Sequence, residues 1–370
     1  MTPLQQQAVD AWSAGVAAVD GYAATQAALQ RSPSSPVKIL AVGKAAAAMT
    51  QAALEHCGEV PTLVVTKDGH AEGLPNHVEV IEAAHPVPDA RSVAGGQALR
   101  KAVMELPEQG ELLLLVSGGA SALAEDPVPG KTLDNLTALN REMLAQGLDI
   151  RAMNRKRRKL SRIKGGRLLD HRISGSVRVL AISDVPDDDI GVIGSGIGAA
   201  LPERRFAYQS EIVASNQHAR DTAAAAATAA GFTLLGNDES LHDDLFALAA
   251  RIGAQLRDMP RGAMILGGEP TVVLPENPGR GGRNQGLALA LAREIAGIPD
   301  LAVVVGGTDG SDGPTDAAGG LIEGTTWQER GADAPGRADR GNRPKAHGSL
   351  LTTRHTGAKR EDLRFAFRAL

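Results

Sequence analysis

Residues 37–49 have the sequence VKILAVGKAAAAM. The first six are apolar except Lys38, with Val and Ile among them, and an apolar run that does not alternate with polar residues is typical of a strand covered on both faces. Gly43 ends the run, and the alanines behind Lys44 favour a helix. A strand, a tight turn and a helix form the repeating unit of a parallel α/β sheet.

The same unit recurs through the first half of the chain. Further short runs rich in Val, Ile and Leu end at glycine or polar residues, and they lie at 63–66, 78–82, 112–117, 177–183 and 212–215. Alanine-rich stretches with a helical composition alternate with these runs. The alternation predicts βαβ units, and therefore an α/β fold with a large N-terminal, Rossmann-like parallel sheet.

The remaining segments predict a smaller C-terminal α/β domain. We expect a helix from the N-terminus to near Arg31, helices at 219–231, about 242–256 and 286–296, and strands at 263–267 and 301–306. The polar stretch 235–240 is the expected linker, and residues 328–346 have the composition of a loop or disordered linker. The predicted division is 1–235 for the N-terminal domain, 236–260 for a linker and helix, and 261–370 for the C-terminal domain.

The composition excludes several classes of protein. Apolar types make up 43% of the 370 residues, which excludes wholesale disorder, and the single cysteine, Cys57, favours a reducing compartment. An aromatic content of only 2% and a net charge of −4 argue against a nucleic-acid partner. The first residues lack the pattern of a secretion signal, and no apolar run approaches the ~18 residues of a membrane span. We therefore expect a soluble, cytoplasmic protein, for which a homodimer is compatible with the sequence but not required by it.

The residues directly after the strands are the candidates for a ligand site, because doubly wound sheets bind ligands beyond the carboxyl ends of their strands. Lys44 would attract an anion together with the N–H groups of the helix that follows it. In the segment 117–122, SGGASA, small residues would let the backbone close around a phosphate, although glycines that serve only packing are common. Neither turn matches a Walker P-loop or a G-x-G-x-x-G fingerprint.

Two charged segments follow later strands or helices. Residues 154–167, NRKRRKLSRIKGGR, admit three interpretations: a nucleic-acid patch, a solvated helix face, or bases that line a cleft and hold phosphate oxygens. Residues 182–189, ISDVPDDD, place four carboxylates close together. Mg²⁺ held by one or two of them is one explanation, and an exposed acidic turn is the other.

The second half has three comparable loops. Residues 267–271, GGEPT, follow a predicted strand, and residues 279–285, GRGGRNQ, place arginine and amide side chains at a helix N-terminus, where anions bind. Residues 307–316, GTDGSDGPTD, lack the terminal glutamate of a calcium loop, and their aspartates would serve Mg²⁺, the substrate or their own turns. Lysine, arginines, glycine loops and aspartates at successive strand ends are together the components of phosphoryl transfer.

Nine short motifs resemble one family, the class II glycerate 2-kinases, whose C-terminal part is called the MOFRL domain. In order along the chain they are AVGKAAAAM, VVTKDGH, HPVPD, SGGASAL, LSRIKGGRL, ISDVPDDD, GGEPTV, GRGGRNQ and GTDGSDGPTDAAG. The resemblance implies phosphorylation of D-glycerate at its 2-hydroxyl by ATP with Mg²⁺, giving 2-phosphoglycerate and ADP, in a cleft between two domains.

The resemblance also implies residue roles. Lys44 would contact the transferring phosphate or the glycerate carboxylate, Asp184 would bind Mg²⁺ or orient the 2-hydroxyl, and Arg283 would act with them. Asp188 is a second candidate for the metal. The implied substrate- and nucleotide-binding residues are Ser117, Gly118, Gly119, Ser121, Asn154, Arg157, Lys164, Glu269, Asn284, Asp309 and Asp312.

The chain departs from the family pattern at several positions. Lys159 stands where the family has histidine, and Asp187 where it commonly has glycine, a replacement that is costly if the position needs a positive φ. Residues 195–198 are SGIG in place of Ser-Gly-Pro-Thr, and 354–359 are RHTGAK in place of Gly-Pro-Thr-Gly-Thr-Asn. The last part of the chain, from Arg330 onward, is atypical throughout.

Two other functions remain open at this stage. An NAD(P)H-dependent hydroxypyruvate reductase is one, because some relatives carry that name, but it predicts a G-x-G-x-x-G turn that the sequence lacks. A catalytically impaired relative that binds glycerate or nucleotide without turnover is the other.

Overall fold

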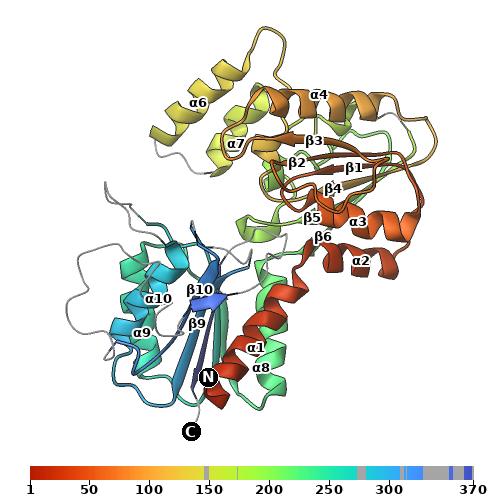
Figure 1. The fold of residues 1–370 in the computed structure, drawn as a ribbon. Helices are drawn as coiled ribbons and strands as arrows, with labels where there is room; N and C mark the ends of the chain where they lie inside the picture. The colour runs from red at the N-terminus through yellow and green to blue at the C-terminus, as the bar shows by residue number, and fades with distance from the viewer. Residues whose placement is uncertain are drawn as a thin grey trace. The chain divides into compact units, whose positions relative to one another are not determined.

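The computed structural model describes residues 1–145, 150–172, 174–272, 281–308, 312–313, 315–327, 350–352 and 362–368. The chain forms two compact units, one of Gly21–Ser215 and one of Met1–Asp20 together with Asn216–Leu370 (Figure 1). This division differs from the expected one, because Met1–Asp20 and the segment from Asn216 to residue 235 belong with the C-terminal part of the chain. Among the described helices, none is both long and apolar enough to cross a membrane.

The unit Gly21–Ser215 is built on a six-stranded, fully parallel sheet in the order β3-β2-β1-β4-β5-β6. The strands are β1 (Pro36–Val42), β2 (Thr62–Lys67), β3 (Glu79–Ala83), β4 (Glu111–Val116), β5 (Ser176–Ile182) and β6 (Ala207–Ala214). Each overlaps one of the six apolar runs of the sequence, although β6 begins five residues before its run, so the prediction of a Rossmann-like parallel sheet is confirmed. The order is that of the doubly wound fold.

Helices cover both faces of this sheet. The helices of this unit are α2 (Gly21–Arg31), α3 (Ala46–Cys57), α4 (Ala90–Met104), α5 (Ala120–Leu123), α6 (Leu133–Ala145) and α7 (Ile150–Lys159), with short 3₁₀ turns η1 (Leu169–His171), η2 (Pro186–Asp188) and η3 (Ile193–Ser195), and α2 to α5 contact its strands. Four consecutive residues of β1, from Ile39 to Val42, are fully buried, which explains why the run shows no polar alternation.

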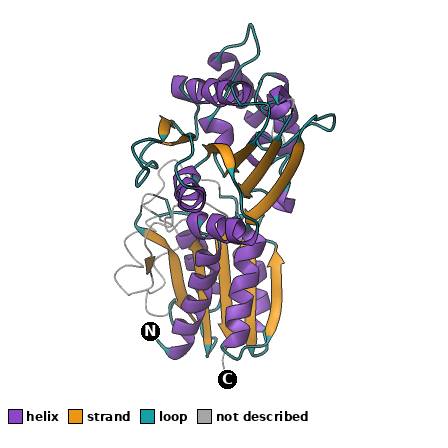
Figure 2. Ribbon diagram, turned by 90° about the vertical axis from the view of Figure 1, so that its right-hand side faces the viewer, coloured by secondary structure: helices purple, strands orange, loops and turns teal. Residues whose placement is uncertain are grey.

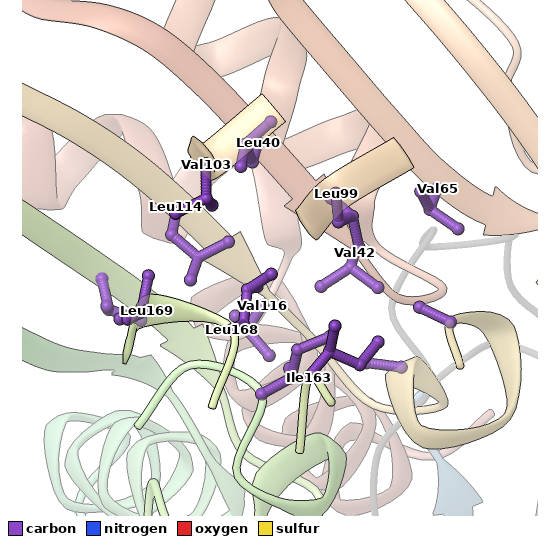
Figure 3. Packing of buried hydrophobic residues seen from close by; sticks show 14 of the residues in the cluster. Leu40, Val42, Val65, Leu99, Val103, Leu114, Val116, Ile163, Leu168 and Leu169 are labelled. Carbon is purple, nitrogen blue, oxygen red and sulfur yellow. The ribbon is translucent and has the colours of Figure 1, made fainter. Parts of the chain in front are cut away.

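One face of the sheet packs against α4. Leu40, Val42, Leu114 and Val116 point from β1 and β4 toward Leu99 and Val103 of this helix (Figure 3). Each of these side chains is at most 2% exposed. Truncation of a leucine in such a position to alanine costs about 2–5 kcal/mol of folding free energy, so this layer holds the strand ends in place.

The sheet order reverses between β1 and β4, and the two strands send their chains to different helices. β1 leads into α3, which packs beside α2, whereas β4 leads into the short α5, which packs beside α4. In doubly wound sheets, ligands bind at the carboxyl edge near the point where the strand order reverses.

The other unit has a mixed six-stranded sheet in the order β11-β10-β9-β12-β8-β7. Its strands are β7 (Leu234–Glu239), β8 (Gly262–Gly268), β9 (Leu301–Gly307), β10 (Ala317–Glu323), β11 (Leu350–Thr352) and β12 (Asp362–Arg368), of which only β7 and β8 pair in parallel. Helices α1 (Pro3–Ala18) and α8 (Asn216–Ala229) cover one face, and α9 (Leu245–Arg257) and α10 (Arg283–Glu294) the other (Figure 1). Figure 2 views this sheet from the side of α1 and α8.

Close packing explains why α1 belongs to this unit. Gly15 of α1 faces α8, and a Cβ on it would lie 2.7 Å from the carbonyl oxygen of Ala219. Trp12, 1% exposed, packs over Gly306 of β9. The single helix expected over the first thirty residues is instead two helices, α1 and α2, which belong to different units.

Two expectations for the second half need correction. The stretch 235–240, expected to be a linker, forms most of the edge strand β7, in which Asn237 and Glu239 are half-buried and Asp238 is exposed. The atypical C-terminus supplies β12, which pairs with both β8 and β9 in the middle of the sheet. The expected loop at 328–346 lies outside the described residues.

Candidate active site

A cavity of about 260 Å³ lies in the unit Gly21–Ser215, at the carboxyl ends of β4 and β5. Five of the residues singled out from the sequence line it, namely Gly119, Ser121, Arg157, Lys164 and Asp184. They come from three separate segments of the chain, the loop after β4, the basic segment and the loop after β5, which the fold brings together.

The loop after β1 is tied to the loop after β4. Gly43 has a φ of 126°, and a Cβ there would lie within 2.8 Å of the Ser117 backbone, so only glycine fits. The N–H of Lys44 donates to the carbonyl of Gly118 at 3.0 Å, and the N–H of Ala45 donates to Ser117 Oγ at 3.1 Å. Ser117 therefore joins two strand-end loops, and its predicted ligand contact remains a proposal.

Lys44 extends from this junction over Gly119. Its side chain is buried, and a Cβ on Gly119 would lie 3.0 Å from Lys44 Cε and 3.3 Å from His85 Cδ2. Gly119 has a φ of 85°, the left-handed region that favours glycine. The small-residue loop thus makes room for the lysine stem and for His85 beside the cavity.

Lys164 forms a buried ion pair with Glu125. The two side chains are 3% and 4% exposed, and Lys164 Nζ also donates to the carbonyl of Ser121 at 2.9 Å. Burial lowers the pKa of Lys164, because the charged ammonium is poorly solvated, while Glu125 acts in the opposite direction. Burial likewise lowers the pKa of the neighbouring Arg157 guanidinium.

The basic segment divides between the interior and the surface. Asn154 and Arg157 of α7 both face inward, as residues one helical turn apart do. Asn154 is 2% exposed and Arg157 lines the cavity, whereas Arg155 and Lys159 are exposed. The interpretation as cleft-lining bases therefore applies to part of the run and the solvated face to the rest.

The glycine pair that follows Lys164 contacts protein backbone. Gly165 and Gly166 have φ values of 64° and 87°, and their N–H groups donate to the carbonyls of Ser195 and Gly196, each at 2.9 Å. The pair thus anchors Lys164 to the loop around η3.

The acidic turn contributes one carboxylate to the cavity. Asp184 lines it, whereas Asp188 is not among the described lining residues, and Asp189 accepts a hydrogen bond from Gly191 N–H at 2.8 Å within its own turn. Asp187 has a φ of 64°. The position where the family commonly has glycine therefore does require the left-handed conformation. The acidic run is thus partly a ligand-facing site and partly a local turn.

Arg283, Glu269, Asn284 and Asp312 lie in the other unit. Arg283 forms an ion pair with Glu269. Asp312 accepts hydrogen bonds from the N–H groups of Asn284 at 3.1 Å and Gln285 at 2.8 Å. A protein carboxylate therefore caps the N-terminus of α10. Asp309 lies outside the described residues.

Several residues of the cavity have no role predicted from the sequence. His85, Pro86 and Pro88 belong to the HPVPD motif quoted for the family resemblance, and His85–Pro86 is a cis peptide bond. Glu125 lies two residues after the end of the SGGASAL motif, and its signal is an acidic residue in an apolar context, which needs a buried cation. The remaining lining residues are Ala122, Leu136 and Leu139.

Two family models match this chain. The one described as "Domain of unknown function (DUF4147)" matches residues 7–229, and the MOFRL family matches residues 262–360. The chain is 32% identical to a D-glycerate 2-kinase of Thermotoga maritima over 97% of both chains. It is 34% identical, over 84% of its own length and 81% of the other's, to an Agrobacterium vitis protein provisionally named hydroxypyruvate reductase.

A solved structure agrees with the sequence matches. The crystal structure of a glycerate kinase from Thermotoga maritima has a TM-score of 0.88 and 31% identity, with 99% of each chain covered. A doubly wound unit with a charged cavity at its strand ends, joined to a second sheet, defines a two-domain α/β enzyme. Within that class, the chain belongs to the glycerate 2-kinase family that carries a C-terminal MOFRL domain, a family of kinases.

Proposed function

We propose that this protein transfers the γ-phosphoryl group of ATP to the 2-hydroxyl of D-glycerate, giving 2-phosphoglycerate and ADP. The observation that carries the proposal is the cavity at the strand ends, where Lys164, Arg157 and Asp184 meet next to Lys44. This set of charges occurs in a chain that matches a D-glycerate 2-kinase over nearly its full length. In the reaction the 2-oxygen forms a bond to Pγ, the bond from Pγ to the bridging oxygen breaks, and the hydroxyl proton is released.

The cationic side chains at the cavity suit the two proposed anionic substrates, ATP and D-glycerate. Phosphoryl transfer needs little covalent chemistry from the protein and depends on positioning and on neutralising charge. Arg157 offers a planar guanidinium for paired hydrogen bonds to phosphate or carboxylate oxygens. Lys44 offers a compact charge beside the glycine loop, where we propose that it contacts the transferring phosphate or the glycerate carboxylate.

Asp184 suits a bound Mg²⁺. In phosphoryl-transfer sites this ion is held by one or two carboxylates together with substrate phosphates and water. Among the described residues there is no group of three His, Cys, Asp or Glu side chains placed to bind a metal, but a site completed by phosphates does not need one. Bound at Asp184, with Asp188 as the second candidate, Mg²⁺ would supply charge neutralisation on the phosphates.

The other unit contributes to the same reaction in this proposal. Arg283 is the proposed third catalytic residue, and Glu269 holds its guanidinium by an ion pair. Asn284, Asp309 and Asp312 are the proposed binding residues of this unit. The test is the Arg283→Ala variant, which we expect to reduce turnover while the unit retains its thermal unfolding transition.

The experiment that tests the function is product analysis. The protein is incubated with MgATP and D-glycerate, and the product is identified by ³¹P NMR. Phosphorus on the 2-oxygen couples to one proton and gives a doublet, whereas phosphorus on the 3-oxygen couples to two and gives a triplet. A doublet supports the proposal, and a triplet or no product contradicts it.

The provisional name of the Agrobacterium vitis relative makes hydroxypyruvate reduction the second candidate. It requires a nicotinamide site, yet the turn after β1 is Gly43-Lys44-Ala45 and lacks the G-x-G-x-x-G pattern. Oxidation of NADH in the presence of hydroxypyruvate, without ATP, would favour this candidate. Calorimetric binding of glycerate or ATP without either reaction would identify a catalytically impaired relative.

A further inference from the structure

A chain of hydrogen bonds runs from the cavity into the protein through two hydroxyl groups and one amide. Ser121 Oγ lies 2.8 Å from Ser195 Oγ, and Ser195 Oγ lies 2.9 Å from Asn154 Oδ1. Asn154 Nδ2 lies 3.5 Å from the carbonyl oxygen of Val192. Ser195 and Asn154 are each 2% exposed, so Ser121 is the member of the chain that lines the cavity.

The direction of this chain follows from its inner end. The carbonyl of Val192 can only accept, so Nδ2 of Asn154 must face it and Oδ1 must face Ser195. Oδ1 also only accepts, so Ser195 donates its single hydroxyl proton to Asn154. The oxygen of Ser195 can then only accept a hydrogen bond from Ser121, and Ser121 must donate its single hydroxyl proton to Ser195.

The consequence is that Ser121 presents an acceptor to the cavity. Its proton points inward, and the remaining lone-pair density of Oγ points outward. Lys164 Nζ donates to the Ser121 carbonyl at 2.9 Å, which ties the backbone of Ser121 to another residue that lines the cavity. An ionised phosphate oxygen is an acceptor as well and gains no hydrogen bond from Ser121, whereas an alcohol gains one.

We infer that Ser121 accepts a hydrogen bond from a hydroxyl group of the hydroxy-acid substrate, and that Ser195 is a positioning residue which fixes the direction of that bond. The inference rests on the proposed function, since it requires the hydroxy acid in this cavity. It assigns Ser121 to the hydroxyl end of the substrate and not to a phosphate.

Ser195 keeps its place although its backbone is strained. Its φ is 61°. L-residues other than Asn and Asp rarely adopt this conformation, whereas glycine adopts it freely. The Ser195→Gly variant therefore relieves the backbone while it removes the hydroxyl. Any loss of function in this variant comes from the missing hydroxyl and not from a distorted loop.

The experiment compares Ser195→Gly, Ser195→Ala and Ser121→Ala with a matched control. The control is Thr50→Val, since Thr50 is fully buried in α3 of the same unit and its Oγ1 has no hydrogen-bond partner among the described residues. KM for D-glycerate, KM for ATP and kcat are measured separately. We expect kcat/KM for D-glycerate to fall about fivefold to tenfold in all three test variants, with KM for ATP and the Thr50→Val enzyme unchanged.

Three results would overturn the inference. A raised KM for ATP with unchanged glycerate kinetics would mean that Ser121 donates to a phosphate. Unchanged kinetics in Ser195→Gly beside impaired Ser195→Ala would mean that the backbone, not the hydroxyl, matters. Unchanged kinetics in Ser121→Ala would mean that Ser121 accepts no hydrogen bond from the substrate.

A binding measurement separates this inference from the proposed function. If the wild-type protein does not phosphorylate D-glycerate, the proposed function fails, and calorimetry with D-glycerate and with inorganic phosphate still tests the hydrogen bond. Weaker binding of D-glycerate alone to Ser195→Gly supports the inference. Weaker binding of inorganic phosphate, or unchanged binding of both, contradicts it.

Discussion

The carboxylate of Asp184 lies directly against the Cα of Gly118, and a Cβ at position 118 would stand only 2.9 Å from Asp184 Cγ and closer still to Oδ2. The loops after β4 and β5 thus determine each other's place at the edge of the cavity. Gly118 does not have a positive φ, so its glycine is required by the neighbouring carboxylate and not by the backbone.

The Gly118→Ala substitution should therefore displace Asp184 with little effect on the fold. A shift of about 1 Å in a catalytic group can cost about a hundredfold in rate, and we expect a fall in kcat/KM of that order with a loss of stability of about 1 kcal/mol. The matched control is Gly58→Ala, since Gly58 has a φ of 79° and open space around it. This control should lose stability and keep its kcat/KM. An unchanged kcat/KM in the Gly118→Ala variant would mean that the position of Asp184 does not matter for the reaction.

Replacing Asp184 by asparagine tests its charge without changing its shape. If Asp184 binds Mg²⁺ or orients the 2-hydroxyl, kcat should fall by at least about a hundredfold, while the midpoint of thermal unfolding stays nearly unchanged. Asp188→Asn is the comparison, because Asp188 does not line the cavity in the described part of the chain. We expect it to retain most of its turnover, and equal losses in both variants would assign both carboxylates to the metal.

Variants of the buried pair of Glu125 and Lys164 test its contribution to stability and its contribution to activity separately. Glu125→Gln leaves the Lys164 ammonium without its counter-ion and should cost about 3–5 kcal/mol in urea unfolding. The double variant Glu125→Gln with Lys164→Met removes both charges, and we expect much of that stability to return. Because Lys164 is a proposed binding residue, the double variant should remain impaired in turnover. Recovery of both properties would show that the pair serves the fold alone.

The sequence predicts the first unit well because its signals are local. A strand buried on both faces is an unbroken apolar run, and Ile39 to Val42 shows this without reference to any other part of the chain. Lys44 and the loop after β4 could be placed at strand ends for the same reason. The order of the strands, and so the meeting of these two loops, depends on packing that no single segment encodes.

The missed features depend on pairs that are distant in sequence. The alternation of Leu363, Phe365 and Phe367 in β12 is a local signal for a strand, but its place between β8 and β9 is decided by long-range pairing. β7 is a half-exposed edge strand, so its polar residues resemble a linker. Glu125 could be understood only once Lys164, 39 positions away, is placed beside it.

The half-buried His70 predicts a pH dependence of stability. Burial lowers the pKa of its imidazole, aided by the charges of Lys67 and Lys44, while its hydrogen bond with the Lys44 carbonyl opposes the shift. The folded pKa thus lies below the ordinary 6.5, and the unfolded chain takes up the proton first as the pH falls. The free energy of unfolding should therefore decline as the pH falls below 6.5 through that window.

The measurement is urea unfolding of the wild type and of His70→Asn across this pH range. The difference between the two should be constant well above pH 6.5 and should change as the pH falls through 6.5, because the variant lacks the titrating group. Since a carbonyl only accepts, Nδ1 carries the proton in the hydrogen bond to Lys44. A difference that does not vary with pH would mean that the imidazole titrates alike in the folded and unfolded chain.

The contacts of Asp312 predict that this residue stabilises helix α10 of the second unit. Its carboxylate receives the N–H groups of Asn284 and Gln285, and α10 has glycine at its N-cap, so the cap comes from a residue 28 positions away from Asn284. A Cβ on Gly282 would overlap this carboxylate, which explains the glycine. Asp312→Ala should lower the free energy of unfolding by about 0.5–2 kcal/mol, the usual range for loss of a helix cap.

The same variant distinguishes a cap from a ligand contact. If Asp312 serves only as the cap, the KM values for ATP and D-glycerate stay unchanged and the loss appears in unfolding alone. If it also binds a ligand, as the family resemblance implies, a KM rises in addition. Asp312→Asn, which keeps one carbonyl acceptor for the helix, should recover part of the stability, and a variant that recovers none would show that the negative charge at the helix N-terminus is what stabilises α10.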